Sequence, residues 1–422
     1  MKKFYSLLSL ITFFVLFNIT SVFSQATVKT VSSFDSNGTY KIGDQIDLVF
    51  WFSEAITVSG TPRLELETGS SDAFATYQSG SGSAFLTFRY TVSEGESSSD
   101  LAYTSTSALA NNGGSSMLDS GGSAATLTLP AVGSASSLSG AQAFVIDGVK
   151  PTMTITASQG SDGFSSDDST LSLTFTSSES TTTFASGDVT VAGGTLSSFS
   201  GSGTTYTATF TPTGGDGAKT IDVAAQTYKD AAGNDNSAAS QFNWTYDSTD
   251  PTLSSVAAVD GTYKVGQNID ITVTWSEAVS KSGTPTLTLS NGATATFISG
   301  DGTSAFVFRY SPSEGDTNSS DLSVSSYSGT IADAAGNTAA AASGDLGSVI
   351  VDANSPAPTM TAVDADGNAV ADGATTNDAY LVLTIETGEA TTNFAVGDIT
   401  VTGGSLSNFA STDSDTYTVR FT

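Results

Sequence analysis

A stretch of 29 residues occurs twice in this chain, in closely similar form. Residues 38–66 read GTYKIGDQIDLVFWFSEAITVSGTPRLEL, and residues 261–289 read GTYKVGQNIDITVTWSEAVSKSGTPTLTL. The two copies align without a gap, since Glu54 and Glu277 are separated by 223 residues, as are Pro62 and Pro285. A self-match at fixed spacing is the signature of a repeat array, so we expect repeated domains.

A second unit, different in sequence, also repeats. The segment FASGDVTVAGG at residues 184–194 returns as FAVGDITVTGG at residues 394–404. We call the first kind of unit type A and the second kind type B. Their order along the chain is A-B-A-B.

Each boundary is marked by an acidic residue that is followed within a few positions by proline, at Pro151, Pro251 and Pro356. We therefore expect domains at residues 25–150 (type A), 151–250 (type B), 251–355 (type A) and 356–422 (type B). The last unit lacks the counterpart of residues 212–247, so we expect it to be truncated and the chain to be a fragment of a longer protein. Proline stiffens such joints and stops a strand from continuing through them.

Alternating apolar residues predict β-strands throughout residues 25–422. Ile46, Leu48, Phe50 and Phe52 alternate with residues that would face the other way, as do their counterparts in the second type A unit, where Trp275 replaces Phe52. Turn pairs such as Asn-Gly and Asp-Gly separate the strands. Short strands at regular spacing predict an all-β sandwich.

Residues 1–24 have the pattern of a secretory signal peptide. Lys2 and Lys3 precede an apolar run that is shorter than the roughly 20 residues a spanning helix needs. Small residues before Gln25 provide a cleavage site. We therefore expect export, an extracellular and cell-surface location, and no membrane insertion of the mature region.

Charge and composition exclude several functions. A net charge of −29 argues against nucleic acid and anionic membranes as partners, and favours hard cations. The chain contains neither cysteine nor histidine. It therefore has no disulfides, no histidine-ligated zinc and no Ser-His-Asp chemistry.

The repeated motifs resemble bacterial immunoglobulin-like repeats of large secreted and surface proteins. In type A these are S-E-A, S-G-T-P, F-R-Y and S-E-G, and in type B F-x-x-G-D-[IV]-T-V-x-G-G. An Asp-Ala-Ala-Gly-Asn motif begins at Asp230 and Asp333, whereas the first unit has Asp-Ser-Gly-Gly from Asp119. The resemblance implies an all-β fold, a linear tandem array of Ig-like sandwiches, and the role of a spacer, stalk or adhesin.

Carboxylates gather at the expected domain ends, and we interpret them as a calcium site. Calcium takes about six to eight oxygen ligands, which loops meeting at a sandwich end can supply, and related extracellular repeat proteins place calcium at such joints. Glu54, Glu179 and Glu389 also lie at strand ends. In the other interpretation, which stays open, these residues only form turns by capping their own backbone. The candidate metal ligands are Asp147, Asp230, Asp247, Asp250, Glu277, Asp333 and Asp352.

We expect no catalytic and no cofactor-binding residues, because the acidic residues repeat from unit to unit at turns, unlike a catalytic pair. Arg89 and Arg309 would form an ion pair with Glu94 and Glu314, or remain solvated on an edge strand. Trp51, predicted to face outward, would stack on a sugar ring or make an ordinary surface contact.

Two functions follow from the sequence. In the first, the chain is a non-catalytic stalk or adhesin region, stiffened by calcium at its joints, with a surface glycan or protein as ligand and its own neighbouring repeats as contacts. In the alternative, these are accessory domains, glycan-binding or spacing, of a secreted polysaccharide-acting enzyme.

Overall fold

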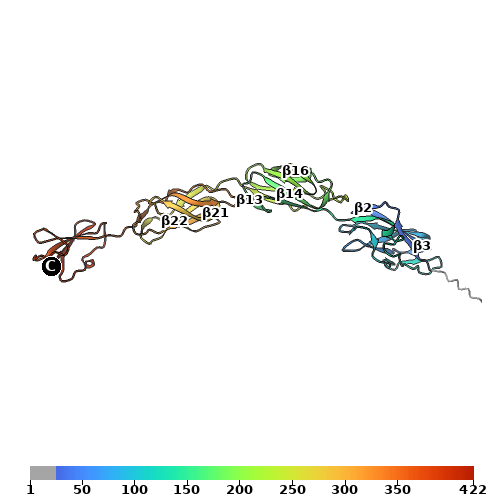
Figure 1. Ribbon diagram of the computed structural model, residues 1–422, viewed down its shortest axis with the longest axis horizontal. Helices are drawn as coiled ribbons and strands as arrows, with labels where there is room; N and C mark the ends of the chain where they lie inside the picture. The colour runs from blue at the N-terminus through green and yellow to red at the C-terminus, as the bar shows by residue number, and fades with distance from the viewer. Residues whose placement is uncertain (1–24) are drawn as a thin grey trace, which may run out of the picture. The chain divides into compact units, whose positions relative to one another are not determined.

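The computed structural model describes residues 25–422, whose regular secondary structure is almost entirely strand, which confirms the expected all-β fold (Figure 1). The chain divides into two compact units. One extends to Phe164 and continues over Asp168–Thr245, and the other comprises Ser165–Asp167 and Tyr246–Thr422. The expected signal peptide, residues 1–24, lies outside the described residues. Within residues 25–422, no helix has the length and the apolar character needed to cross a membrane.

Strands β1–β11 form the first sandwich. Ile46, Leu48, Phe50 and Phe52 are all fully buried, whereas Trp51 is half exposed, because successive side chains of a strand face opposite sides. One sheet has the order β1-β3-β6-β5-β4-β8, with β10 beside β3 and β9 beside β4, and the other has the order β2-β11-β7. The elements are β1 (Val28–Ser33), β2 (Gly38–Lys41), β3 (Gln45–Ser59), β4 (Arg63–Glu67), β5 (Ala73–Ser79), β6 (Ser83–Thr91), β7 (Ser97–Ser98), β8 (Ala102–Tyr103), β9 (Leu109–Ala110), β10 (Ser116–Leu118), α1 (Leu138–Ala141) and β11 (Phe144–Asp147).

Strands β12–β18 form the second sandwich, from sheets of order β12-β14-β16 and β13-β18-β17-β15. Its core is rich in aromatic residues, including Phe175, Phe210 and Trp244, all of them fully buried. The elements are β12 (Met153–Ala157), β13 (Phe164–Ser166), β14 (Leu171–Thr181), the 3₁₀ turn η1 (Ser186–Asp188), β15 (Val189–Ala192), β16 (Gly194–Pro212), β17 (Gly217–Val223) and β18 (Phe242–Tyr246).

Strands β19–β26 form the third sandwich, which repeats the pairing of the first. Strands β20 and β26 pair in parallel, as β2 and β11 do, and the larger sheet has the order β22-β23-β21-β24-β25 with β19 beside β21. Trp275 is buried, as Phe52 is. The elements are β19 (Leu253–Ala257), β20 (Gly261–Lys264), β21 (Ile269–Leu289), β22 (Thr294–Ser299), β23 (Thr303–Tyr310), β24 (Ser323–Ala332), β25 (Gly344–Asp345) and β26 (Val349–Asp352).

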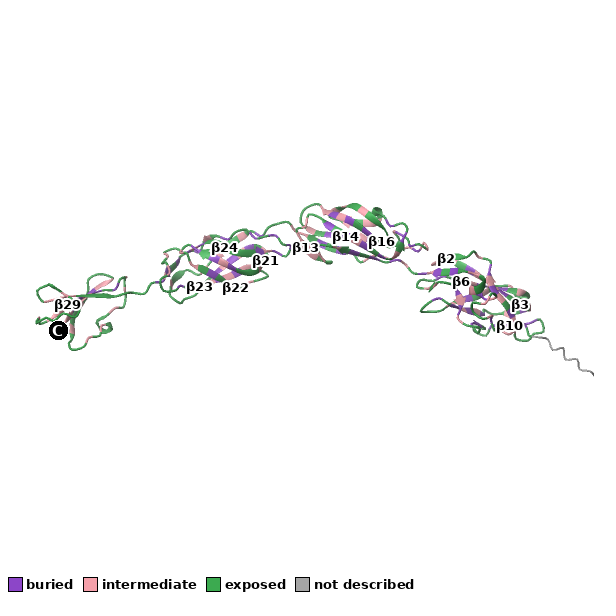
Figure 2. Ribbon diagram, in the orientation of Figure 1, coloured by how far each residue is buried: buried purple, intermediate pink, exposed green. Residues whose placement is uncertain are grey.

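The segment from β27 onward contains one five-stranded sheet of order β28-β27-β29-β31-β30. Its buried core is small and centres on Leu383, Ile385 and Val419. Figure 2 shows how the buried residues follow the strands, whereas most loops are exposed. The elements are β27 (Thr359–Val363), β28 (Ala369–Val370), β29 (Leu381–Glu386), the 3₁₀ turn η2 (Val396–Asp398), β30 (Leu406–Ser411) and β31 (Thr416–Phe421).

The expected partners of the repeated arginines were wrong. Arg89 binds Asp47 through two charge-assisted bonds, from Nε at 2.7 Å and from a terminal nitrogen at 2.8 Å. Arg309 binds Asp270 in the same way at 2.6 and 2.7 Å. Each pair lies directly across two antiparallel strands, where opposite charges attract, so strand pairing rather than nearness in sequence selects the partner.

Candidate metal centre

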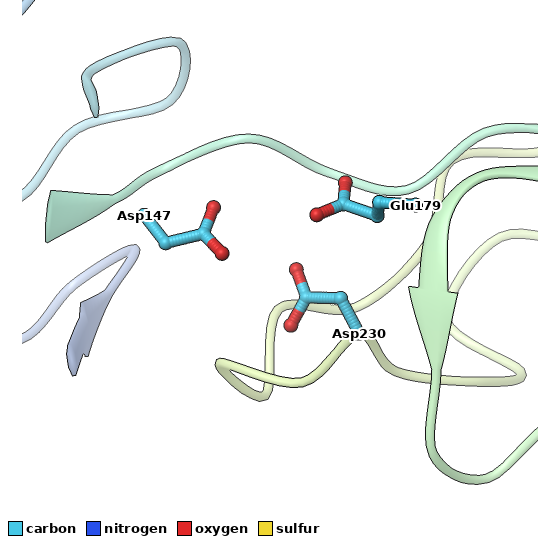
Figure 3. Close-up of side chains that lie close together, drawn as sticks. All are labelled: Asp147, Glu179 and Asp230. Carbon is cyan, nitrogen blue, oxygen red and sulfur yellow. The ribbon is translucent and has the colours of Figure 1, made fainter. Parts of the chain in front are cut away.

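Three carboxylates from three separate segments of the first unit converge where the first sandwich ends. Asp147 is the last residue of β11, Glu179 lies near the end of β14, and Asp230 lies in the loop after β17. Each offers one oxygen, and these three oxygens lie within 4.8 Å of one another. Figure 3 shows the three carboxyl groups pointing toward a common space. We call this group the first carboxylate cluster.

The loop that carries Asp230 explains why this aspartate is only 1% exposed. Its Oδ1 accepts the backbone N–H groups of Gly233 at 2.6 Å and Asn234 at 2.8 Å, and its Oδ2 accepts the side-chain amide of Asn234 at 2.9 Å. The turn chemistry expected of Asp-Ala-Ala-Gly-Asn is therefore present. A carboxylate has about four lone-pair sites, so these three bonds leave room for one more partner.

Electrostatics make this group of carboxylates unfavourable without a positive charge. Burial, followed by the charges of Asp147 and Asp230, raises the pKa of Glu179 to about 7. Two full charges 4.8 Å apart repel by about 3.5 kcal/mol at an effective dielectric constant of about 20. A bound cation would convert this repulsion into attraction, so the cluster favours either a proton or a cation.

A second cluster repeats this arrangement in the second unit. Asp247 directly follows β18, Glu277 lies in β21, and Asp333 follows β24. One oxygen of each lies within 4.8 Å of the others. Asp333 is 8% exposed, and its Oδ1 accepts three backbone N–H groups, those of Ala335, Gly336 and Asn337, at 2.7–2.9 Å. We call this group the second carboxylate cluster.

Two asparagines, each the last residue of an Asp-Ala-Ala-Gly-Asn motif, link their loop to the backbone that precedes the sandwich. The side-chain amide of Asn234 donates to the carbonyl of Asp147 at 2.8 Å, and its Oδ1 accepts the backbone N–H of Ile42 at 2.9 Å. The amide of Asn337 donates to the carbonyl of Asp247 at 2.9 Å. The last position of Asp-Ala-Ala-Gly-Asn therefore holds the backbone beside each cluster. Its recurrence in both motifs is the sequence signal that marks this role.

The glutamates of the repeated S-E-G motif also contact the segment that follows their sandwich. Glu94 forms an ion pair with Lys150 at 2.6 Å. Glu314 accepts the backbone N–H of Ser355 at 2.9 Å and its hydroxyl at 2.7 Å. Lys150 and Ser355 hold equivalent places, three residues after Asp147 and Asp352. In both type A units, the glutamate at this equivalent position therefore contacts the start of the next joint.

Not every expected ligand lies in a cluster. Asp250 is exposed and belongs to neither group. Asp352 ends β26 as Asp147 ends β11, and it accepts a bond from the amide of Asn318 at 3.3 Å. Asp352 and Glu389 line the same recess, and no third carboxylate joins them to form a cluster among residues 25–422.

The first sandwich has the corresponding loop without a cluster. The Oδ1 of Asp119 accepts the N–H groups of Gly121 and Ser123, at 2.9 and 2.8 Å. Glu54, the counterpart of Glu277, accepts the hydroxyl of Ser120 at 2.7 Å. Neither carboxylate belongs to a group of three in the described part of the chain. This loop can therefore form its turn without contributing to a carboxylate cluster.

The fold defines a class, that of proteins built from tandem Ig-like β-sandwiches. Three consecutive regions, residues 147–246, 247–349 and 355–422, match the model of the bacterial Ig-like domain. Because these regions make up more than half of the 422 residues, the chain belongs to the bacterial Ig-like domain family. The expected family and fold class are confirmed.

Two further comparisons add little. A solved structure of titin domains I67-I69, an E-to-A mutated variant, covers 78% of this chain and 99% of its own, with 8% sequence identity and a TM-score of 0.24. No curated protein matches the chain.

Proposed function

We propose that this chain is a non-catalytic spacer or stalk region of an exported, cell-surface protein, and that calcium stiffens its joints. The Ig-like repeats support a spacing role. The negative charge favours the binding of hard cations such as calcium. No step of this function requires a reacting substrate, so we assign no catalytic residue.

One observation carries the calcium proposal, namely that an equivalent set of three carboxylates, two aspartates and one glutamate, meets at each of two successive joints. In each cluster, one carboxylate comes from the joint, one from a strand of the following sandwich, and one from its Asp-Ala-Ala-Gly-Asn loop. A cation bound by all three would tie the joint to the sandwich that follows it. All the donors are oxygen atoms, the ligand type that calcium prefers.

The expected effect of calcium is on stiffness rather than on folding. Extracellular calcium modules bind with dissociation constants on the order of 10⁻⁴–10⁻³ M. At ten times its dissociation constant, calcium would add about 1.4 kcal/mol per site by mass action. A gain of this size holds a joint without deciding whether the sandwiches fold, because each sandwich has its own apolar core.

Thermal unfolding and small-angle scattering, each with calcium and with EDTA, test the proposal. We expect calcium to raise the melting temperature by a few degrees, as about 1 kcal/mol does for domains of this size. We also expect the largest dimension of the particle to increase, and the distribution of this dimension among molecules to become narrower. If neither quantity responds to millimolar calcium, the aspartates act as turn formers only, and the chain is a spacer without metal.

A further inference from the structure

The first sandwich carries an exposed aromatic surface that the spacer function does not use. The rings of Trp51 and Phe85 lie directly opposite each other on β3 and β6, with their centroids 5.8 Å apart and their planes at 20°. Each side chain is 52% exposed, and Phe34, which follows β1, is 92% exposed. We call Phe34, Trp51 and Phe85 the aromatic face.

Polar groups surround this face. Phe34 and Phe85 border a shallow hollow that continues over Val49 to Asp35 and Thr87. A second hollow, which shares Phe34, Val49 and Phe85 with the first, is also bordered by Trp51 and by residues of β1. Exposed apolar surface rimmed by polar residues marks binding sites more often than single exposed apolar residues do.

The fold itself does not require these aromatic residues. In the third sandwich, Thr274 and Ala305 take the places of Trp51 and Phe85, and they face each other in the same antiparallel pairing. The buried faces of the same strands stay apolar in both copies. The strands therefore form equally well with small residues here, and the large exposed rings of the first sandwich need another explanation.

We propose that the aromatic face binds a neutral polysaccharide chain. The two rings stack on each other and each leaves about half of its surface exposed, which offers apolar area on which the C–H face of a pyranose can pack. Nearby hydroxyl and carboxylate groups can bond to sugar hydroxyls. Arg89, the cation nearest to this face along β6, is paired with Asp47, and the chain is strongly acidic, so anionic polymers are disfavoured. An open sheet face suits an extended polymer better than a small ligand, which proteins usually enclose in a concave pocket.

Affinity electrophoresis of the full chain tests this proposal, in gels that contain hydroxyethylcellulose, galactomannan or xylan. We expect at least one of these neutral polysaccharides to retard the protein. The substitutions Trp51→Thr and Phe85→Ala should weaken this retardation about tenfold or more, as is typical for aromatic residues at the centre of an interface. These substitutions introduce the residue types that the third sandwich carries at the same positions, so they should preserve the fold.

Ile298→Ala serves as the control, because it removes an exposed apolar side chain from the third sandwich instead. It should leave the retardation unchanged. Equal retardation of Trp51→Thr and the unsubstituted protein would overturn the proposal, as would no retardation by any of the three polysaccharides.

Tryptophan fluorescence provides an independent measurement. The chain has three tryptophans, and Trp244 and Trp275 are both buried, so acrylamide quenching reports mainly on Trp51. The polysaccharide that retards the protein in the gel should reduce the quenching of Trp51 fluorescence by acrylamide. Protection that instead depends on protein concentration, without polysaccharide, would mean that a second copy of the chain covers the face, and protection by an added protein alone would mean a protein ligand. Either result would contradict the proposal.

Discussion

Glu179 is the residue on which the electrostatics of the first carboxylate cluster depend most. Among residues 25–422, no group donates a hydrogen bond to its carboxyl that would offset the loss of hydration, and two other carboxylates face it. Its pKa of about 7 lies above the ordinary value of 4.5. In the native state it therefore holds a proton over a pH range in which the unfolded chain has already released it.

This shift predicts how stability depends on pH without calcium. Between about pH 4.5 and 7 the native state binds more protons than the unfolded state, so its stability should fall as pH rises through this window and then level off. Thermal unfolding in EDTA at intervals from pH 5 to pH 8 measures this effect. A melting temperature that rises with pH over the same range would contradict it.

The substitution Glu179→Gln separates the charge from the shape of this side chain. Without calcium at pH 7.5 we expect it to raise the melting temperature, because it removes repulsion, and to flatten the pH dependence. Calcium bound at the first carboxylate cluster should no longer raise the melting temperature, because the substitution removes one of the three ligands. Glu54→Gln is the matched control, since Glu54 is the counterpart of Glu277 in the first sandwich and lies within β3, in neither carboxylate cluster, and it should change neither quantity.

At the scale of single residues, the sequence named the carboxylates at the domain ends but not their groupings. It put Asp147 and Asp230 among seven candidate ligands and Glu179 among the strand-end carboxylates, without assigning the three to one cluster. It missed the Asp47–Arg89 pair, because strand register cannot be read from a single sequence. It also missed the role of Asn234, because an asparagine in a turn motif is ordinarily explained by the turn itself.

At the scale of elements, the Asp-Ala-Ala-Gly-Asn loop connects each sandwich to the joint before it. The asparagine performs this function through its side chain, which is nearly completely buried at both positions. Its amide bonds to the backbone carbonyl of the joint aspartate, at Asp147 or at Asp247. The loop therefore holds the joint with or without a bound metal.

Replacing Asn234 by alanine should destabilise the first unit by about 1–3 kcal/mol, because it leaves buried partners without their hydrogen bonds. Asn234→Ala should also speed hydrogen exchange at the amide of Ile42, which loses its acceptor. Asn368→Ala is the control. Asn368 bonds to Asp364 within a similar turn but is exposed. Removing its side-chain amide should therefore lower the free energy of unfolding by less than about 0.5 kcal/mol. Equal effects of the two substitutions would show that Asn234 acts only within its own turn.

The strands themselves were well predicted. Alternation placed the buried faces of β3 and β21 correctly, because one sandwich face is apolar and the strand period is two. The short strands β7, β8 and β9 in the first sandwich, each of two residues, could not be predicted in this way, because two residues carry no period.

At the scale of the whole molecule, repetition is what links sequence to function. The internal repeats predicted tandem domains, and the family match shows that three consecutive regions from residue 147 onward are Ig-like. Two of the joints carry a carboxylate cluster, whereas the described part of the chain lacks a third carboxylate beside Asp352 and Glu389. We therefore expect two calcium ions per chain.

Calorimetric titration of calcium into the EDTA-treated and dialysed chain tests this central claim most directly. We predict two equivalent sites, one lost in Asp230→Asn and the other in Asp333→Asn, with the double substitution binding none. Magnesium should compete weakly, because it requires a more regular shell of ligands. Absence of binding at millimolar calcium, or a stoichiometry unchanged by either substitution, would contradict the claim that these joints are metal sites.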